Sequence, residues 1–375
     1  MYQKRRSAFY RDFAQRVQQY GGMYNAHLHL DRVNTLDEAY MTINNRPILD
    51  NSFVSLHKKH ALISNIHSGL AYQEQDLRRR VTECLDEMVA CGTANADSMV
   101  DVTADGVGLS ALNILSDIKK QYQDQLQVNL AAYSPFGFND AHPEAWEVFC
   151  EGVKHADFIG SLPEADDTDD YPDHIGFMTH CERMLDLAQR EQKYIHVHTD
   201  QRNDPSETGT ERLITAVKNF GSLGLDKNNR PMVWAVHAIS PSTYEDKRFE
   251  AMVEGLVEND IGIICCPSAA IGMRQLRPIQ TPTYNSIPRL LEMLTAGVQV
   301  RLASDNIADI CSPTTTADLT DEVFVLSAAL RFYHTDILAK LATDTPLTQS
   351  DKNFIAEHLE QNNKEIQKII EQHYR

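Results

Sequence analysis

Short apolar runs alternate along the chain with longer stretches of helical periodicity. Before Gly92, apolar residues recur every three or four positions, which is the spacing of one helix face. The residues of that stripe are Leu77, Val81, Leu85, Met88 and Val89. Gly92 stands where such a helix is expected to end. The apolar runs predict eight strands: Tyr24–His29, Asn95–Val102, Val128–Tyr133, Asp157–Leu162, Tyr194–His198, Met232–His237, Gly262–Cys266 and Val298–Ala303.

Strands that alternate with helices in this way predict a closed parallel barrel. We therefore expect an α/β fold with a single (β/α)8 TIM barrel over residues 1–375. About 65 residues, 30 to 94, separate the first two strands, which predicts a helical insertion over the barrel mouth. From Thr315 onward the pattern predicts a helical C-terminus. Only 26 residues precede His27, so we expect no accessory β-sandwich before the barrel.

Composition and charge narrow the class of partner. Hydrophobic residues make up 42% of the chain and charged residues 23%, as in soluble globular proteins. The net charge of −18 argues against nucleic acid and anionic membranes, which attract clustered Lys and Arg. The seven cysteines are odd in number and form no CxxC pair, which favours reduced thiols in the cytoplasm. These features predict a soluble, cytoplasmic protein whose partner is a small molecule.

Candidate metal ligands fall at the ends of the predicted strands. His27 and His29 close the first strand in NAHLHLDR, and residues two apart on a strand point to the same side. His198 and His237 end the fifth and sixth strands, and Asp305 follows the eighth. Any one of these residues alone is as consistent with a structural hydrogen bond. Their joint order at the carboxyl ends of barrel strands, however, predicts a metal site.

That order is the one found in the amidohydrolase superfamily, and the chain resembles the cytosine deaminases from about residue 24 to 340. The segments that carry the resemblance are LRRRVTECLDEMVACGTANADSMVDV, LQVNLAAYSPFGF, HADFIGSLPEADD, HVHTDQRNDP and PRLLEMLTAGVQVRLASDNIADICSP. The flanking sheet domain of that family has no counterpart here. The resemblance implies a metal-dependent hydrolase that acts on a C–N bond, and it leaves a homo-oligomer open.

By position, His27, His29, His198 and Asp305 resemble the ligands of one divalent ion, either zinc or iron. Asp305 also resembles the general base that takes a proton from water, and His237 the residue that stabilises developing charge. His196, two residues before His198, is interpreted as lying behind the ligands. Relatives that hold two ions usually bridge them with a Lys or a Glu at the end of the fourth strand. Here that end reads FIGSLPEADD, with no Lys and with Glu164 only after Pro163, which favours a single ion.

Three positions expected at the substrate differ from the cytosine deaminases. Gln201 replaces a Glu that moves protons, and an amide does not titrate near neutral pH. Phe136 lies where that family presents polar side chains, and Asn306 replaces a second Asp. The substrate is therefore predicted not to be cytosine, but an amide, a cyclic amide or an amino-substituted heterocycle. Asp200 or Asp204 is a candidate to assist Asp305, or else a loop charge.

Two other classes of function stay open at this point. A barrel that keeps its metal but has lost efficient catalysis would act as a small-molecule binding protein. Cys265 and Cys266, which end the seventh predicted strand, offer a thiol nucleophile, although buried cysteines are more often small apolar residues. Arg274 and Arg277 follow the same strand, and either contact an anionic substrate or face solvent.

Overall fold

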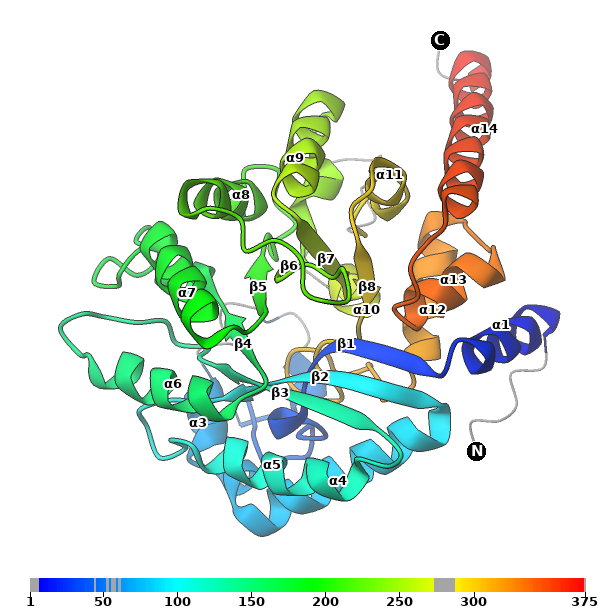
Figure 1. Cartoon of the computed structure of the whole chain (residues 1–375). Helices are drawn as coiled ribbons and strands as arrows, with labels where there is room; N and C mark the ends of the chain where they lie inside the picture. The colour runs from blue at the N-terminus through cyan, green and yellow to red at the C-terminus, as the bar shows by residue number, and fades with distance from the viewer. Residues whose placement is uncertain are drawn as a thin grey trace.

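The centre of the molecule is one sheet of eight parallel strands, each paired with the next along the chain (Figure 1). This computed structural model describes residues 7–43, 45–51, 54, 59, 62–272 and 287–373. The strands are β1 (Met23–His29), β2 (Thr93–Asp101), β3 (Gln127–Tyr133), β4 (Phe158–Ser161), β5 (Ile195–Thr199), β6 (Val233–His237), β7 (Ile261–Cys265) and β8 (Val300–Leu302). All eight predicted strands are confirmed to within two residues at either end.

The last strand returns to the first and closes the barrel. A parallel bridge joins Leu28 to Asp305, and the Asp305 N–H donates to the carbonyl of His27 at 2.9 Å. The Asn25 side chain adds a second link, since its amide donates to Ser304 Oγ at 2.7 Å and its oxygen accepts the Ser304 N–H at 3.0 Å. The carboxyl ends of all strands therefore lie at one rim, where barrels of this type carry their sites.

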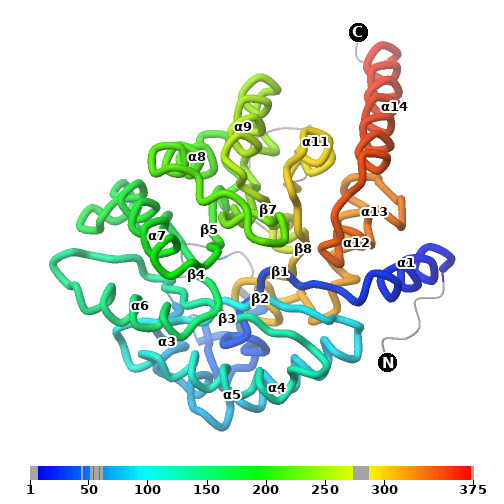
Figure 2. The backbone as a smooth tube through the Cα atoms, in the orientation of Figure 1, coloured from blue at the N-terminus to red at the C-terminus, as the bar shows by residue number. Residues whose placement is uncertain are grey.

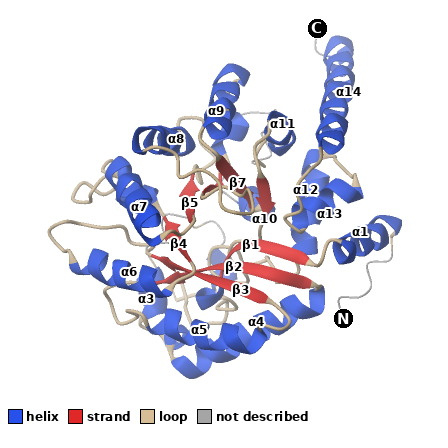
Figure 3. Ribbon diagram, viewed as in Figure 1, coloured by secondary structure: helices blue, strands red, loops and turns tan. Residues whose placement is uncertain are grey.

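Helices surround the barrel and separate the strands (Figure 3). They are α4 (Glu74–Cys91), α5 (Ser110–Tyr122), α6 (Glu144–His155), α7 (Phe177–Glu191), α8 (Gly209–Phe220), α9 (Asp246–Glu258) and α11 (Leu290–Ala296), with a short α10 (Pro267–Gly272) after β7. Helix α4 buries the predicted stripe of Leu77, Val81, Leu85 and Met88. It ends at Gly92, whose φ of +88° is a left-handed conformation that costs glycine little.

Large side chains fill the interior of the barrel below the carboxyl rim. Trp234 on β6 is completely buried, and the guanidinium of Arg301 on β8 lies 4.0 Å above its ring. On the neighbouring β7, Gly262 makes room for the indole, because an added Cβ would lie 2.4 Å from a ring carbon. The interior is thus a packed core and not a channel.

The segment between β1 and β2 is a helical insertion, as predicted. It contains η1 (Leu30–Arg32), η2 (Ile48–Asn51), α3 (Ile63–His67) and η3 (Leu70–Tyr72) before α4. Tyr72 donates to Asp31 just beyond β1, and His67 bonds Asp101 at the end of β2. An apolar cluster ties the insertion to the loop after β8, and its buried members are Met41, Ile43, Ile48, Ile66, Ala71 and Ile310. The insertion therefore covers part of the carboxyl rim.

The C-terminal part is helical, as predicted, with α12 (Leu319–Leu330), α13 (Thr335–Ala342) and α14 (Gln349–His373). Helix α1 (Ala8–Gln19) packs beside α13, where Arg16 and Asp336 form an ion pair at 2.7 Å. Helix α14 extends away from the barrel (Figure 2). Every strand in the described ranges belongs to the barrel sheet, so the expected lack of an accessory β-sandwich holds there. No described helix combines the length and the apolar character needed to cross a membrane.

Candidate metal centre

Three histidines converge at the carboxyl rim beside one carboxylate. The ring nitrogens of His27, His29 and His198 lie within 4.8 Å of one another. The closest pair is Nε2 of His27 and Nε2 of His198, at 3.1 Å. Oδ1 of Asp305 lies 3.7 Å from Nε2 of His27 and 3.4 Å from Nε2 of His29. Strands β1 and β5 and the end of β8 thus bring together the four residues that the sequence singles out as ligands.

The local environment gives these histidines the form that binds metals. Burial lowers the pKa of His27 well below its usual value, and the neighbouring His198 lowers it further. Burial also lowers the pKa of His29, with an added effect from Arg32, whose guanidinium contacts Nδ1 of His29. Nδ1 of His198 faces the carbonyl of Ser161 at 3.0 Å, which turns its Nε2 toward His27. Neutral imidazoles grouped with a carboxylate are a donor set that fits zinc or iron.

His237 completes the cluster from the end of β6. Its ring centroid lies 5.4 Å from that of His198 and 6.1 Å from that of His27. Its backbone has a φ of +76°, followed by +48° at Ala238, and Asp305 has +61°. Residues other than glycine adopt such angles at a cost of about 1–3 kcal/mol each, and they concentrate at functional sites. The strain is therefore located at two of the five residues that sequence analysis selected.

A small cavity of about 20 Å³ lies over the cluster. Its lining residues are His29, Arg32, Tyr133, His198, Gln201, His237, Asp305, Asn306, Cys311 and Ser312. Gln201 and Asn306, which were predicted to contact the substrate, thus both line this cavity. Phe136 does not line this cavity. It packs against His67, with ring centroids 5.3 Å apart, and lines a neighbouring cavity of about 550 Å³ that lies next to the insertion.

Two carboxylates that sequence analysis did not select stand behind the cavity, Glu164 half-buried and Asp309 buried. Glu164 accepts the Asp200 N–H at 2.7 Å and the Gln201 side-chain amide at 2.9 Å. Burial raises the pKa of Glu164 to about 7, and the charge of Asp200 adds to the effect. Asp309 likewise accepts the side-chain amide of Asn306 at 2.5 Å. The only local signal for Glu164 is its position directly after Pro163 at the end of β4, which does not reveal a partner 37 residues away.

The contacts of the remaining candidate residues distinguish between the roles expected for them. Asp200 is buried, and both carboxylate oxygens accept backbone N–H groups at the start of α8, so it supports a helix and is not a loop charge. His196 lies outside the group of converging ligands and packs on Phe158, with ring centroids 4.6 Å apart. Cys265 and Cys266 are buried, and burial raises the pKa of both thiols, which disfavours a thiolate nucleophile. The predictions for positions 274 and 277 lie outside the described residues.

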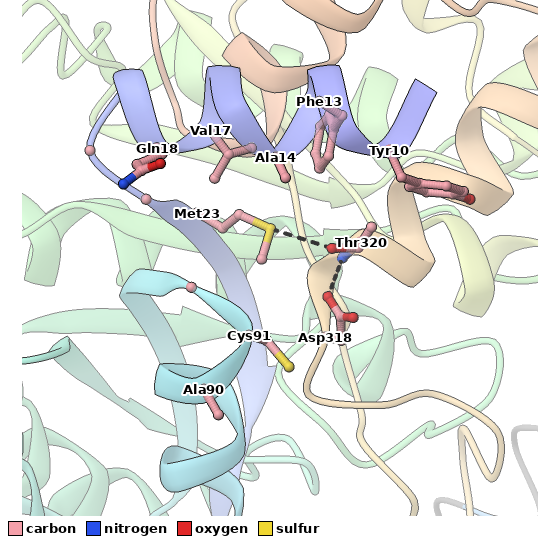
Figure 4. A pocket seen from close by; sticks show the side chains of 13 residues that line it. Tyr10, Phe13, Ala14, Val17, Gln18, Met23, Ala90, Cys91, Asp318 and Thr320 are labelled. Carbon is pink, nitrogen blue, oxygen red and sulfur yellow. Dashed lines mark hydrogen bonds between the residues drawn. The ribbon is translucent and has the colours of Figure 1, made fainter. Parts of the chain in front are cut away.

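A larger cavity, about 610 Å³, lies at the other end of the barrel (Figure 4). It is bounded by α1, by the start of β1 at Met23 and by the end of α4 at Cys91. Phe13, Ala14 and Val17 give it an apolar wall. None of the converging histidines lines it, so volume alone would point to the wrong end of the molecule.

Comparison with known proteins places this geometry in context. No family model matches the chain. An uncharacterised protein of Haemophilus influenzae is 26% identical over 275 residues, covering 73% of this chain and 91% of that protein. The structure of 5-methylcytosine deaminase from Klebsiella pneumoniae with phosphonocytosine has a TM-score of 0.73 at 22% identity, over 86% of this chain and 73% of the deaminase. N-isopropylammelide isopropylaminohydrolase from Burkholderia multivorans has a TM-score of 0.64 at 17% identity, over 86% and 72%.

The fold is therefore a (β/α)8 barrel, as the sequence predicted, and it resembles the barrels of these two enzymes. Within that class, the solved structures that it resembles include a deaminase and an aminohydrolase of nitrogen heterocycles. The identities are low, so the likeness concerns the arrangement of the chain and leaves the chemistry to be argued from the site.

Proposed function

We propose that this protein is a metal-dependent hydrolase that cleaves a non-peptide C–N bond in a small molecule. The observation that carries the proposal is the convergence of His27, His29 and His198 with Asp305 at the carboxyl rim. The three imidazoles are buried, and burial favours the neutral form that a metal requires. The structural likeness to a deaminase and an aminohydrolase supports the same reaction class.

In this proposal, His27, His29, His198 and Asp305 hold one divalent ion, zinc or iron. Such an ion, when bound, supplies a Lewis acid and lowers the pKa of water toward neutrality. Asp305 acts as the general base, and its strained backbone keeps the carboxylate directed at the histidines. His237, at the edge of the cluster, stabilises charge that develops on the water or the substrate. A single ion is favoured because Glu164 at the end of β4 binds Asp200 and Gln201.

The surroundings of the ligands limit the substrate. Gln201 cannot carry a proton to a ring nitrogen, so all proton transfer falls to Asp305. Asn306 and Gln201 are neutral hydrogen-bonding groups, which favours an uncharged amide, cyclic amide or amino-substituted heterocycle other than cytosine. The net charge of −18 supports a small molecule, and not nucleic acid or an anionic membrane, as the partner. Phe136, next to His67, would contact only a substrate that extends under the insertion.

The second candidate is a metal-containing barrel that binds a small molecule without efficient turnover. It is favoured by one observation, the replacement of a titratable side chain by Gln201 in the cavity wall. The two candidates differ in whether Asp305 is needed for turnover or only for retaining the metal.

The first test is elemental analysis of gently purified protein for zinc, iron, manganese, cobalt and nickel. We expect about one ion per chain, lost in His29→Ala and in Asp305→Ala but retained in the exposed-site control His155→Ala. Amides and aminated heterocycles are then screened, and Asp305→Asn should lose turnover by roughly 100-fold or more, as for a missing general base. An Asp305→Asn protein with full activity would refute that role. A bound ion without turnover of any screened compound would favour the binding protein, whereas no ion after refilling with zinc or ferrous iron would contradict both candidates.

A further inference from the structure

Two amide side chains reach the cavity from different strand ends, and the NH2 group of each bonds a carboxylate, that of half-buried Glu164 or of buried Asp309. Nε2 of Gln201, after β5, donates to Oε2 of Glu164 at 2.9 Å. Nδ2 of Asn306, after β8, donates to Oδ2 of Asp309 at 2.5 Å. Both amides line the cavity, and both are only 5% exposed. The same arrangement therefore occurs twice in one small site.

Backbone groups fix the two carboxylates in turn. The second oxygen of Glu164 accepts the Asp200 N–H at 2.7 Å. The second oxygen of Asp309 accepts the N–H groups of Cys311 and Ser312, at 2.7 and 3.0 Å. An ionised carboxylate only accepts hydrogen bonds, so each amide must turn its NH2 group toward it.

The orientation of the NH2 groups decides what the amides offer to a ligand. Among the described residues, no hydrogen bond engages Oε1 of Gln201 or Oδ1 of Asn306. The unused group of each side chain is thus an acceptor. A ligand that presents N–H groups would satisfy both oxygens, whereas a ligand with ring-nitrogen lone pairs would leave them unpaired in a buried site.

We propose, on the basis of the hydrolase function above, that Glu164 and Asp309 are positioning residues that make the cavity accept N–H donors. They hold Gln201 and Asn306 with their carbonyl oxygens available, and the substrate class selected is a small cyclic urea, or a related ring with two N–H groups. The specificity is set by side chains that do not touch the substrate.

Two rings of equal size test this selection. Imidazolidin-2-one has two N–H groups where cyclopentanone has two CH2 groups. Their affinities are compared by calorimetry at mildly alkaline pH, where Glu164 is ionised. The urea should bind more tightly by about tenfold for each hydrogen bond gained. In Glu164→Gln and in Asp309→Asn the preference for the urea should fall by about tenfold. The new neutral amide can donate a hydrogen bond, so the side-chain amide of Gln201 or Asn306 is free to rotate by about 180° and present its NH2 group to the ligand.

The matched control is Glu207→Gln, which removes a neighbouring half-buried carboxyl bonded to Ser240 and to the Arg202 N–H but to neither cavity amide. The control should keep the wild-type preference. Equal affinity for the two rings in the wild type would overturn the proposal. An undiminished preference in both Glu164→Gln and Asp309→Asn would overturn it equally.

The orientation is also read without any ligand, from side-chain amide NMR signals in protein labelled with ¹⁵N at Gln and Asn. Gln201→Ala and Asn306→Ala assign the two signals. In wild type, each of the two amide signals should show one proton shifted downfield by the bonded carboxylate. The downfield shift should disappear for Gln201 in Glu164→Gln and for Asn306 in Asp309→Asn. If neither ring binds, the NMR signals test the proposal on their own. Amide proton shifts that are the same in wild type, Glu164→Gln and Asp309→Asn would overturn it.

Neither measurement needs turnover. A protein that shows the preference and the shifts but no metal-supported hydrolysis would refute the proposed function alone. A hydrolase without the preference and the shifts would refute this inference alone.

Discussion

Asp200 should be one of the most sensitive positions for stability, although it lies in a loop beside the candidate metal centre. It follows β5, and its two carboxylate oxygens accept the N–H groups of Gly209 and Thr210 at 2.6 and 2.8 Å. These are the first two residues of α8, whose preceding residue, Thr208, makes no side-chain cap. Asp200 thus caps a helix that begins nine residues later, from a fully buried position.

The expected loss of stability follows from the backbone N–H groups that Asp200→Ala would leave without an acceptor. Two N–H groups at a buried helix start lose their acceptors, at roughly 1–2 kcal/mol each when water partly replaces the bond. Alanine must also adopt the φ of +58° found at Asp200, at about 1 kcal/mol. Release of the buried charge offsets part of this, because burial raises the pKa of Asp200. We expect a net loss of about 2–4 kcal/mol, and about half of that for Asp200→Asn, which keeps one acceptor and tolerates this φ.

The assay is urea unfolding of wild type, Asp200→Ala and Asp200→Asn at neutral pH. The free energies of unfolding are compared provided that the three proteins share the same dependence on urea concentration. Asp204→Ala is the matched control, because within the described ranges the Asp204 side chain hydrogen-bonds only to neighbouring Ser206, and its loss should cost under about 0.5 kcal/mol. A loss below about 1 kcal/mol for Asp200→Ala would refute the capping argument. So would an Asn variant as unstable as the Ala variant.

Three further outcomes follow from the structure. His67 is buried, which alone would lower its pKa, but hydrogen bonds to two carboxylates raise the pKa above 6.5. Wild type should therefore exceed His67→Gln in stability most below pH 6.5, and the difference should shrink as the pH rises through the pKa of the folded protein. A stability difference that does not change with pH in urea unfolding would contradict this. Gly262→Ala should destabilise by about 1–3 kcal/mol, since the new Cβ meets the Trp234 ring, and a neutral effect on thermal unfolding would show that the indole can move. Alkylation of the native protein should leave Cys265 and Cys266 unmodified while chelation abolishes hydrolysis, because both thiols are buried with raised pKa values. Rapid labelling of either with loss of activity would revive the thiol mechanism.

The strands and the ligand candidates were predictable because each depends on local sequence. A strand in a barrel is a short apolar run, and its carboxyl end is where the run stops. His27 and His29 are two residues apart on one strand, so their shared direction follows from strand geometry alone. The same reasoning located His198 and Asp305 once the strands had been counted.

Phe136 and Glu164 show where that reasoning ends. Both follow a strand, and of the two only Phe136 was expected at the substrate. In the structure Phe136 turns to His67 of the insertion, and Glu164 turns to Gln201. Each outcome depends on a partner more than 35 residues away in sequence, and no periodicity carries that information.

The sequence by itself determined the class of fold and the residues offered to a metal, because strand and helix periods and the order of residues along the chain are properties of neighbouring positions. The tertiary structure decided that Glu164 supports the site, since its partners, the Asp200 N–H and the Gln201 amide, are 36 and 37 residues away in sequence and are brought close by the closed barrel. Asp309, in contrast, bonds Asn306 only three residues away. A buried carboxylate must find such donors wherever the fold supplies them. The same physical requirement sets the direction of Gln201 and Asn306, and with it the hydrogen bonds that the cavity offers.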